Sequence, residues 1–281
     1  MRKIIKFIGR NAVRVGLVTS VALSSLCVWA VDAKERYFDH NGKIAIVIDD
    51  IGYKHSDKRL LDMEAPLTFA VLPHTPLGAK YAQLAAQNQR DVIIHLPMQA
   101  HDNNRLLGPG ALLTDMNKQQ YQQTLLQALE DIPYAIGVNN HMGSLLTQKE
   151  RPMSWTMELL RQHNMFFLDS KTTNQSKVEQ VALEWGVNTL DRNIFLDHHK
   201  DPAFIRKQLA RTINIAKKYG SAIAIGHPYK ETYEVLKQEL PYLEAHGVEL
   251  VPLSSLLPTA PVIQFAGQRP DYDPKQDIGS E

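Results

Sequence analysis

The stretch that decides the fold is KIAIVIDDIG, residues 43–52. Its consecutive apolar residues, Ile44 to Ile48, predict a strand that is buried on both faces, as the strands of parallel sheets are. The run ends directly in Asp49 and Asp50. Adjacent carboxylates repel each other and are costly to bury. The pair therefore either caps the next element at a solvated strand end or lies in a polar pocket beside a cation.

Short apolar runs alternate with amphipathic stretches downstream of this strand. Helical periodicity runs through residues 77–90 and 118–132, and Asp201 with Pro202 predicts the start of a helix that ends at Gly220. The further predicted strands cover residues 67–72, 91–95, 134–138, 165–168, 193–196, 222–226 and 248–253. Such alternation predicts an α/β fold in which seven or eight parallel strands form a (β/α) barrel. A doubly wound open sheet is the alternative, although no glycine-rich phosphate loop follows the first strand.

The N-terminal residues differ in composition from the rest of the chain. A basic leader precedes residues 15–29, an apolar run that is short for a membrane span, and Ala30 and Ala33 provide small-residue cleavage sites. We interpret residues 1–33 as a secretory signal peptide, with an uncleaved membrane anchor as the alternative. The signal peptide predicts a periplasmic protein without stable membrane insertion after cleavage. Cys27, the sole cysteine, would be removed with the signal peptide, so no disulfide is expected.

The remaining chain is predicted to contain one domain. Residues 34–42 form a short N-terminal segment, and residues 43–257 form the domain. Residues 258–281 are rich in proline, glycine and charge, which indicates a flexible C-terminal tail. The formal net charge of +1 argues against a protein that binds nucleic acid through a strongly basic surface. The oligomeric state stays open.

Polar residues directly follow most of the predicted strands. After the aspartate pair of the first strand, those that follow later strands are His95, Asn139, Asn140, His141, Asp169, Ser170, Asp197 and His227. In a parallel barrel the carboxyl ends of all strands meet at one face, where active sites form. Each residue also has a simpler explanation, because an aspartate after a strand often caps the next helix and a single histidine can be buried and hydrogen-bonded. Three histidines at the same end of successive strands favour a functional site.

The residue types in this set are those of a metal-dependent hydrolase. Imidazoles with a carboxylate suit zinc or a similar divalent ion, which lowers the pKa of water and polarises the carbonyl under attack. A further carboxylate can accept the proton of the water, and a histidine near its ordinary pKa can protonate the leaving group. A serine triad is less well supported, because the chain contains no GxSxG nucleophile elbow.

Six motifs in chain order, IAIVIDDIGY, TFAVLP, IIHLPM, GVNNHMGS, FFLDS and IAIGHP, closely resemble the divergent polysaccharide deacetylase family. The resemblance covers about residues 43–257 and implies a distorted (β/α) barrel with metal-dependent carbohydrate deacetylase chemistry. It also implies that Asp49 is the catalytic base, that Asp50 and His95 bind the metal, and that His227 is the catalytic acid.

The chain departs from the better-known deacetylases at two places. Gln99 stands four residues after His95, where those enzymes carry a second metal-binding histidine, and GVNNHMGS stands where they carry an arginine motif. We infer that His141 supplies the missing metal ligand. The candidates for residues that support the ligands and the acid–base pair are Asn140, Asp169 and Asp197.

Residues and resemblance together predict an exported hydrolase that acts on carbon–nitrogen bonds other than peptide bonds. It would use one divalent metal, for which zinc is the predicted ion, to remove acetyl groups from an envelope polysaccharide or a peptidoglycan-type glycan. The alternatives are a catalytically impaired envelope protein that binds glycan or metal on the same barrel, and an amide hydrolase whose substrate is not a sugar. Retention of Asp49 and His227 favours turnover, because a protein that only binds needs neither a base nor an acid.

Overall fold

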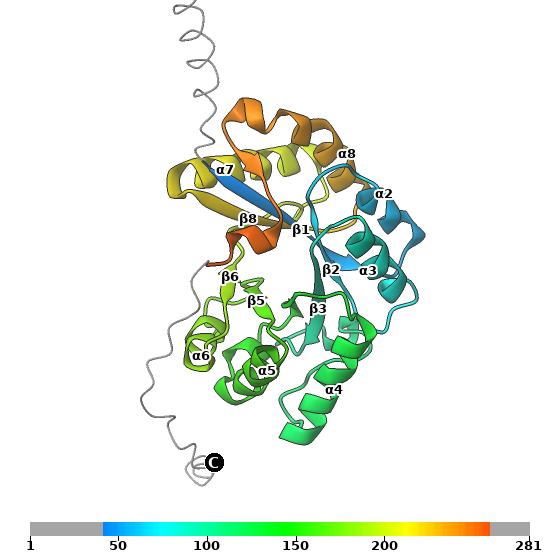
Figure 1. Cartoon of the computed structure of the whole chain (residues 1–281), viewed down its shortest axis with the longest axis vertical. Coiled ribbons are helices and arrows are strands. Elements are labelled where there is room, and N and C mark those ends of the chain that lie inside the picture. The colour runs from blue at the N-terminus through cyan, green and yellow to red at the C-terminus, as the bar shows by residue number, and fades with distance from the viewer. Residues whose placement is uncertain (1–41, 259–281) are drawn as a thin grey trace, which may run out of the picture. The chain divides into compact units, whose positions relative to one another are not determined.

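The computed structural model describes residues 42–258 of the chain. The predicted signal peptide, all but the last residue of the predicted N-terminal segment and nearly all of the predicted C-terminal tail lie outside the described residues. Within them, the strands form one sheet with helices around it (Figure 1). The strands are β1 (Lys43–Ile51), β2 (Thr68–Val71), β3 (Val92–Met98), β4 (Gly137–Met142), β5 (Phe166–Asp169), β6 (Thr189–Asp191), β7 (Ile194–Phe195), β8 (Ser221–Gly226) and β9 (Glu249–Leu250).

The strand that opens the domain is an inner strand of the sheet, between β2 and β8. Hydrogen-bonded neighbours follow the order β6-β5-β4-β3-β2-β1-β8-β7, and β9 also pairs with β1. All of these pairings are parallel. Because β6 and β7 are the two ends of the order, the barrel stays open between them. The prediction of a distorted parallel (β/α) barrel is confirmed.

The apolar run of β1 is explained by burial on both of its faces. Alternate residues of a strand point to opposite faces of the sheet. Ile44, Ile46 and Ile48 belong to a large hydrophobic cluster that includes helix residues, whereas Ala45 and Val47 belong to a smaller cluster made mainly of strand residues. All five side chains are fully buried. Each face of β1 therefore packs against its own apolar layer.

The helix ends follow the predicted capping signals. The Asp201 side chain accepts a hydrogen bond from the backbone N of Phe204, and Gly220 ends the same helix in the left-handed region. Gly186 ends another helix in the same way, whereas Gly247 follows a 3-10 helix. The α-helices are α2 (Lys58–Leu61), α3 (Gly78–Gln87), α4 (Lys118–Asp131), α5 (Glu150–Gln162), α6 (Val178–Trp185), α7 (Pro202–Tyr219) and α8 (Lys230–Glu239). The 3-10 helices are η1 (His55–Asp57), η2 (Asn104–Leu106), η3 (Leu146–Gln148), η4 (Leu240–Tyr242), η5 (Glu244–His246) and η6 (Leu253–Leu256).

Three strands differ clearly from their prediction. The strand predicted at residues 134–138 is β4, which covers Gly137–Met142, so Asn139, Asn140 and His141 lie within it rather than after it. The sequence pattern does not predict β6, because Thr189–Asp191 is short, only partly buried and without an apolar run. The strand predicted at residues 248–253 is limited to Glu249–Leu250, since Pro252 has no backbone N–H to donate and η6 begins directly after it. Among residues 42–258, no helix combines the length and the apolar character that are needed to cross a bilayer.

Candidate active site

A bulge in β1 turns both adjacent aspartates toward the same histidine. In a regular strand, neighbouring side chains point to opposite faces. The register of β1 against β2 shifts between Ile48 and Ile51, which leaves one extra residue in β1, and Asp50 has a φ of 58° in the left-handed region. As a result, Asp49 Oδ2 lies 3.6 Å from His95 Nε2 and Asp50 Oδ1 lies 3.2 Å from the same atom. The aspartate pair thus lies in a shared polar site rather than at a helix cap.

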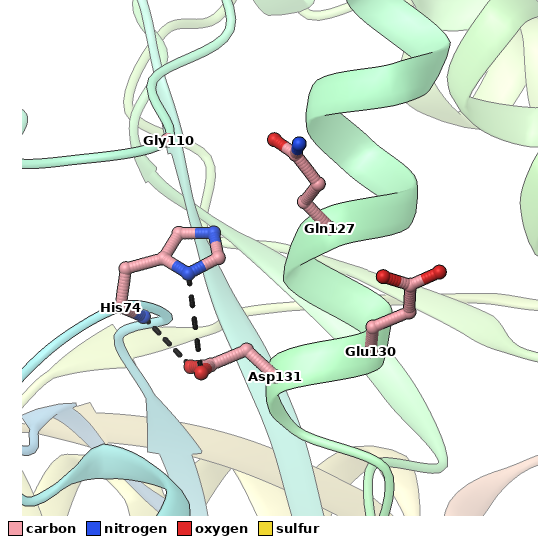
Figure 2. A pocket seen from close by; sticks show the side chains of 5 residues that line it. All are labelled: His74, Gly110, Gln127, Glu130 and Asp131. Atoms are coloured by element: carbon pink, nitrogen blue, oxygen red, sulfur yellow. Dashed lines mark hydrogen bonds and ion pairs between the residues drawn. The ribbon is translucent and has the colours of Figure 1, made fainter.

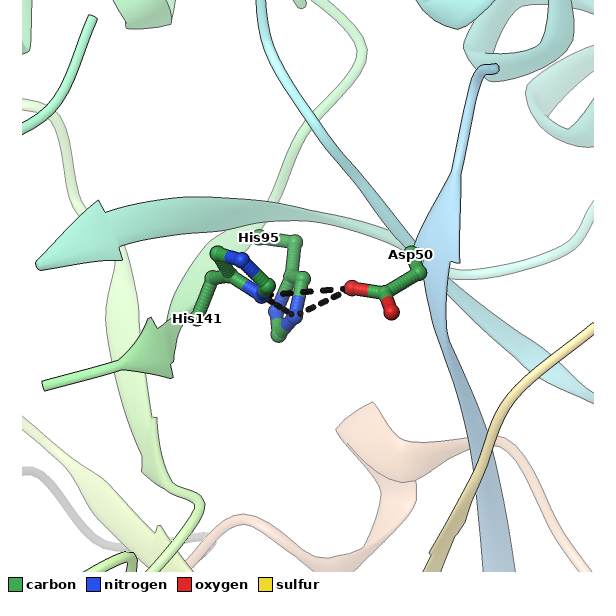
Figure 3. Close-up of side chains that lie close together, drawn as sticks. All are labelled: Asp50, His95 and His141. Atoms are coloured by element: carbon green, nitrogen blue, oxygen red, sulfur yellow. Dashed lines mark hydrogen bonds and ion pairs between the residues drawn. The ribbon is translucent and has the colours of Figure 1, made fainter. Parts of the chain in front are cut away.

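Asp50, His95 and His141 converge from three strands on one point (Figure 3). Asp50 Oδ1 lies 3.2 Å from His95 Nε2 and 3.2 Å from His141 Nδ1, and these two nitrogens are 3.0 Å apart. Ligand atoms that each lie about 2.1 Å from a common ion are separated by roughly 3.0 to 3.4 Å. The spacing therefore fits a single small divalent ion.

The surroundings of these atoms also fit a cation. Asp50 Oδ1 is buried and lacks a hydrogen-bond partner, although both imidazoles are near it. His95 turns its Nδ1 to Asn139 Oδ1 at 2.8 Å, and His141 turns its Nε2 to the carbonyl oxygen of Leu106 at 3.4 Å. Metal-binding histidines commonly donate their second nitrogen to such oxygens, which leaves the first nitrogen unprotonated. Three electron-pair donors then face one another, an arrangement that a cation stabilises.

Strand register explains why these side chains meet. His95 of β3 pairs with Asn139 of β4, and Pro97 pairs with His141. Asn139 and His141 are two residues apart and therefore share a face of β4, on the same side as His95. Asn139 was expected among the polar residues that follow a strand, but the sequence predicted no role for it. Its role follows from two facts: it lies two residues before His141, on the same face of β4, and the register of β3 against β4 places it beside His95. The sequence alone does not provide that register.

Gln99 does not take part in the cluster. Its Oε1 accepts hydrogen bonds from the backbone N of Thr114 at 2.7 Å and from Thr114 Oγ1 at 2.8 Å. These contacts hold the chain that follows β3. The position beside Asp50 and His95 is occupied by His141, from the neighbouring strand.

Burial and neighbouring charges shift the two aspartate pKa values in opposite directions. Burial raises the pKa of Asp49 above its ordinary value, and the charges of His95 and His227 offset this only in part. Burial also acts to raise the pKa of Asp50, but contacts with His141 and His95 hold it well below its usual range. Asp50 is therefore the stable carboxylate of the pair, and Asp49 has the higher affinity for a proton.

On another side of the site, Asp197 holds His227. Asp197 Oδ1 lies 2.8 Å from His227 Nδ1, and Asp197 Oδ2 accepts hydrogen bonds from His227 N and Thr232 Oγ1, both at 2.6 Å. Burial acts to lower the pKa of His227, but the hydrogen bond and charge of Asp197 outweigh it and raise that pKa to about 9. The expectation of a histidine near its ordinary pKa is therefore wrong, because the Asp197 carboxylate is itself buried and close.

The other two residues predicted to support the site brace loops beside it. Asn140 Oδ1 accepts a hydrogen bond from the backbone N of Ser170 at 2.9 Å, which ties the end of β4 to the chain after β5. Asp169 accepts hydrogen bonds from the backbone N of Lys171 at 2.8 Å and from Ser176 Oγ at 2.6 Å. These contacts shape the rim of the barrel, whereas Asp197 contacts His227 directly.

A cleft of about 180 Å³ opens onto the cluster. Asp50 and His141 line it together with Tyr53, Leu106 and Tyr229. Tyr53 is 50% exposed and Leu106 is 63% exposed, which is unusual for large apolar side chains beside a polar cluster. A cleft with apolar walls and a few convergent polar groups is typical of a small-molecule site.

A separate depression of about 570 Å³ lies beside His74 (Figure 2). His74 N donates to Asp131 Oδ2 at 2.7 Å, and the His74 ring nitrogen Nδ1 lies 3.9 Å from Asp131 Oδ1. These contacts tie the chain after β2 to the end of α4. Because this depression shares no lining residue with the cleft, His74 is a structural residue outside the candidate active site.

Comparisons with known proteins concern the family and the fold of the chain. Residues 46–257 match the sequence profile of the divergent polysaccharide deacetylase family. The uncharacterized protein YibQ of Escherichia coli K12 is 39% identical over 217 residues, which cover 77% of this chain and 67% of that protein. An uncharacterized protein of Haemophilus influenzae is 33% identical over 268 residues, 92% of this chain and 95% of its own. A crystal structure of an uncharacterized protein from Agrobacterium tumefaciens has the same fold, with a TM-score of 0.73 at 19% identity over 76% of this chain and 89% of that one.

Proposed function

Because this chain belongs to the divergent polysaccharide deacetylase family, we propose that it is a metal-dependent hydrolase. In this proposal it removes acetyl groups from an envelope polysaccharide or a peptidoglycan-type glycan. The observation that carries the proposal is the arrangement of three groups at one rim. A set of three metal-ligand atoms lies beside a buried carboxylate, Asp49, and near a histidine, His227, that is paired with its own carboxylate.

Asp50, His95 and His141 would hold the metal ion. Two imidazole nitrogens and one carboxylate oxygen are a ligand set that zinc accepts, and zinc is the ion we propose. When bound, the ion would polarise the acetyl carbonyl and lower the pKa of water beside it.

Asp49 acts as the base in this proposal. Its Oδ1 accepts a hydrogen bond from Asn139 Nδ2 at 2.9 Å, which leaves Oδ2 on the side of the cluster. Burial raises the pKa of Asp49, so this carboxylate accepts a proton from the attacking water more readily than an exposed aspartate would.

His227 acts as the acid. Its Nδ1 is engaged by Asp197, which leaves Nε2 to donate a proton to the departing nitrogen or oxygen. The ring is stacked against both Phe195 and Tyr229, with centroid distances of 6.3 Å and 5.4 Å. A pKa of about 9 keeps this histidine protonated at neutral pH, as a general acid requires.

The cleft suits an acetylated sugar. Its polar end at Asp50 and His141 would receive the acetyl carbonyl, and Tyr53, Leu106 and Tyr229 would contact the apolar face of the ring. We also propose that the protein is exported to the periplasm, where such glycans occur. N-terminal sequencing of the protein recovered from the cell envelope tests this, since a mature chain that began at Met1 would contradict it.

The proposed function is tested by metal analysis of the purified mature protein together with acetate release from cell-wall fragments. We expect one divalent ion per chain and measurable acetate release. Asp49→Asn and His227→Ala should keep the ion and lose on the order of a hundredfold in turnover. His74→Ala is the matched control, because His74 also follows a strand but lies outside the cleft.

Three outcomes separate the alternatives. Bound metal without acetate release from any glycan or simple acetamide would favour a protein that only binds. Release from simple acetamides but not from glycans would favour an amide hydrolase with a non-sugar substrate. Near-normal turnover in Asp49→Asn or His227→Ala would refute the role assigned to that residue.

A further inference from the structure

Asn139 is a fully buried amide that links the proposed base to a proposed metal ligand. Its Oδ1 lies 2.8 Å from His95 Nδ1, and its Nδ2 lies 2.9 Å from Asp49 Oδ1 and 3.2 Å from Ser170 Oγ. The residue has 0% exposure. A buried amide makes its hydrogen bonds with fixed partners, and leaving one unmade is costly. The side chain is therefore held in one orientation.

The chemistry of the partners decides which end of the amide faces which residue. An ionised carboxylate can only accept hydrogen bonds, so the NH₂ group of Asn139 must face Asp49. The amide oxygen then faces His95, and it can only accept. In the neutral ring, His95 Nδ1 must therefore carry the proton, and His95 Nε2 is left with a free electron pair. That atom is the one that faces Asp50 and His141.

We propose that Asn139 is a positioning residue that fixes the tautomer and the ring orientation of His95 in the form that binds a metal ion. Through its second hydrogen bond it holds Asp49 in place at the same time. The tautomer of the neutral His95 ring is thus set by the fold before any ion arrives. The inference rests on the proposed function where it refers to a metal, but the tautomer of His95 can be measured without one.

The test uses the ion-free protein and then zinc alone. Two-bond ¹H–¹⁵N correlation spectra identify which nitrogen of His95 carries the proton, and competition with a chelating dye gives the dissociation constant for zinc. The variants are Asn139→Leu, which is similar in size and removes both hydrogen bonds, and Asn139→Asp. In Asn139→Asp, one carboxylate oxygen can share a proton with Asp49 in place of the amide donor, and the other oxygen still accepts a hydrogen bond from His95. Ser170→Ala is the control, because it removes only the third contact of Asn139.

We expect His95 to be protonated at Nδ1 in the wild-type protein, in Ser170→Ala and in Asn139→Asp. Asn139→Leu should lose this tautomer preference and bind zinc roughly 10- to 100-fold more weakly. Rescue of zinc affinity by Asn139→Asp would show that the hydrogen bonds of this side chain matter rather than its packing, because leucine and aspartate both fill the space of the asparagine.

The inference is overturned if the neutral ring of wild-type His95 carries its proton at Nε2, or if Asn139→Leu keeps both the tautomer and the zinc affinity. It is also overturned if Asn139→Asp loses as much zinc affinity as Asn139→Leu. A wild-type protein that binds no zinc and releases no acetate would instead contradict the proposed function, and the tautomer measurement would still decide the role of Asn139.

Discussion

Replacing Asp197 by asparagine should change how the stability of the protein depends on pH. Asp197 Oδ2 accepts hydrogen bonds from His227 N and Thr232 Oγ1, so in Asp197→Asn the amide oxygen is needed at that position. The NH₂ group then faces His227 Nδ1, where the wild-type protein has a carboxylate oxygen at 2.8 Å. A donor at this position stabilises the neutral imidazole and disfavours the protonated one. We expect the pKa of His227 to fall from about 9 toward its ordinary value of 6.5 or below.

The size of the effect follows from the two pKa values of His227. In the folded wild-type protein the pKa is about 9, and the ordinary value, which we take for the unfolded chain, is 6.5. A histidine whose pKa is raised by folding contributes stability that is fully present below pH 6.5 and is lost as the pH rises through 9. In this window the folded protein holds one more proton than the unfolded chain. The free energy of unfolding should therefore fall by about 1.4 kcal/mol per pH unit, or about 3 kcal/mol across the window.

Urea unfolding at several pH values between 6 and 10 measures this difference directly. The quantity to compare is the loss of unfolding free energy across this range in the wild-type protein and in Asp197→Asn, because other titrating groups then cancel. Thr232→Val is the control, since it removes a partner of Asp197 without changing the contact with His227. An NMR titration of the His227 ring in the ion-free protein should give the same pKa of about 9 in the wild type.

The reasoning is refuted if the wild-type protein and Asp197→Asn lose the same stability between pH 6 and pH 10. It is also refuted if the ring of wild-type His227 titrates near pH 6.5. If His227 is the acid of a hydrolase, the upper limit of the pH–rate profile should move to lower pH in Asp197→Asn as well.

Three further changes have expected outcomes. His141→Ala should lose most of the bound metal while Gln99→Ala keeps it, because Gln99 Oε1 is engaged by Thr114. Metal analysis after purification checks this, and full occupancy in His141→Ala would show that the third ligand has been misassigned. Gly137→Ala should lower the free energy of unfolding by about 1 to 3 kcal/mol, because the new Cβ would lie 2.7 Å from the Phe166 ring; an unchanged melting temperature would mean that the ring moves aside freely. Asn117→Ala should lower the free energy of unfolding by about 1 kcal/mol, because the Asn117 side chain caps α4 by accepting a hydrogen bond from the backbone N of Gln120. A urea unfolding midpoint that did not shift would contradict this.

Much of the fold was predictable because its signals are local. The apolar run of β1 indicates a strand buried on both faces, and Asp201, Gly186 and Gly220 mark helix ends by their own backbone and side-chain chemistry. β6 was missed for the opposite reason: its three residues are held as a strand by pairing with β5, not by any pattern of their own.

The candidate site was predictable only as a set of residues at one rim. Parallel strands bring their carboxyl ends to the same face, so polar residues that follow strands at distant positions were expected to meet there. Asp50, His95 and His141 do converge, and their role as metal ligands stays a prediction. The shared face follows from strand direction, which the alternation of strands and helices already indicates.

Which polar residues touch was decided by the tertiary structure. Asn139 contacts His95 and Asn140 does not, although they are adjacent, because strand parity and the register of β3 against β4 place only one of them on the inner face. The bulge at Asp50 turns two neighbouring carboxylates to one histidine, where a regular strand would separate them. Sequence by itself determined which chemical groups reach the rim, since that depends on strand ends. Contact, orientation and pKa depend on register shifts of a single residue, and only the folded chain sets those.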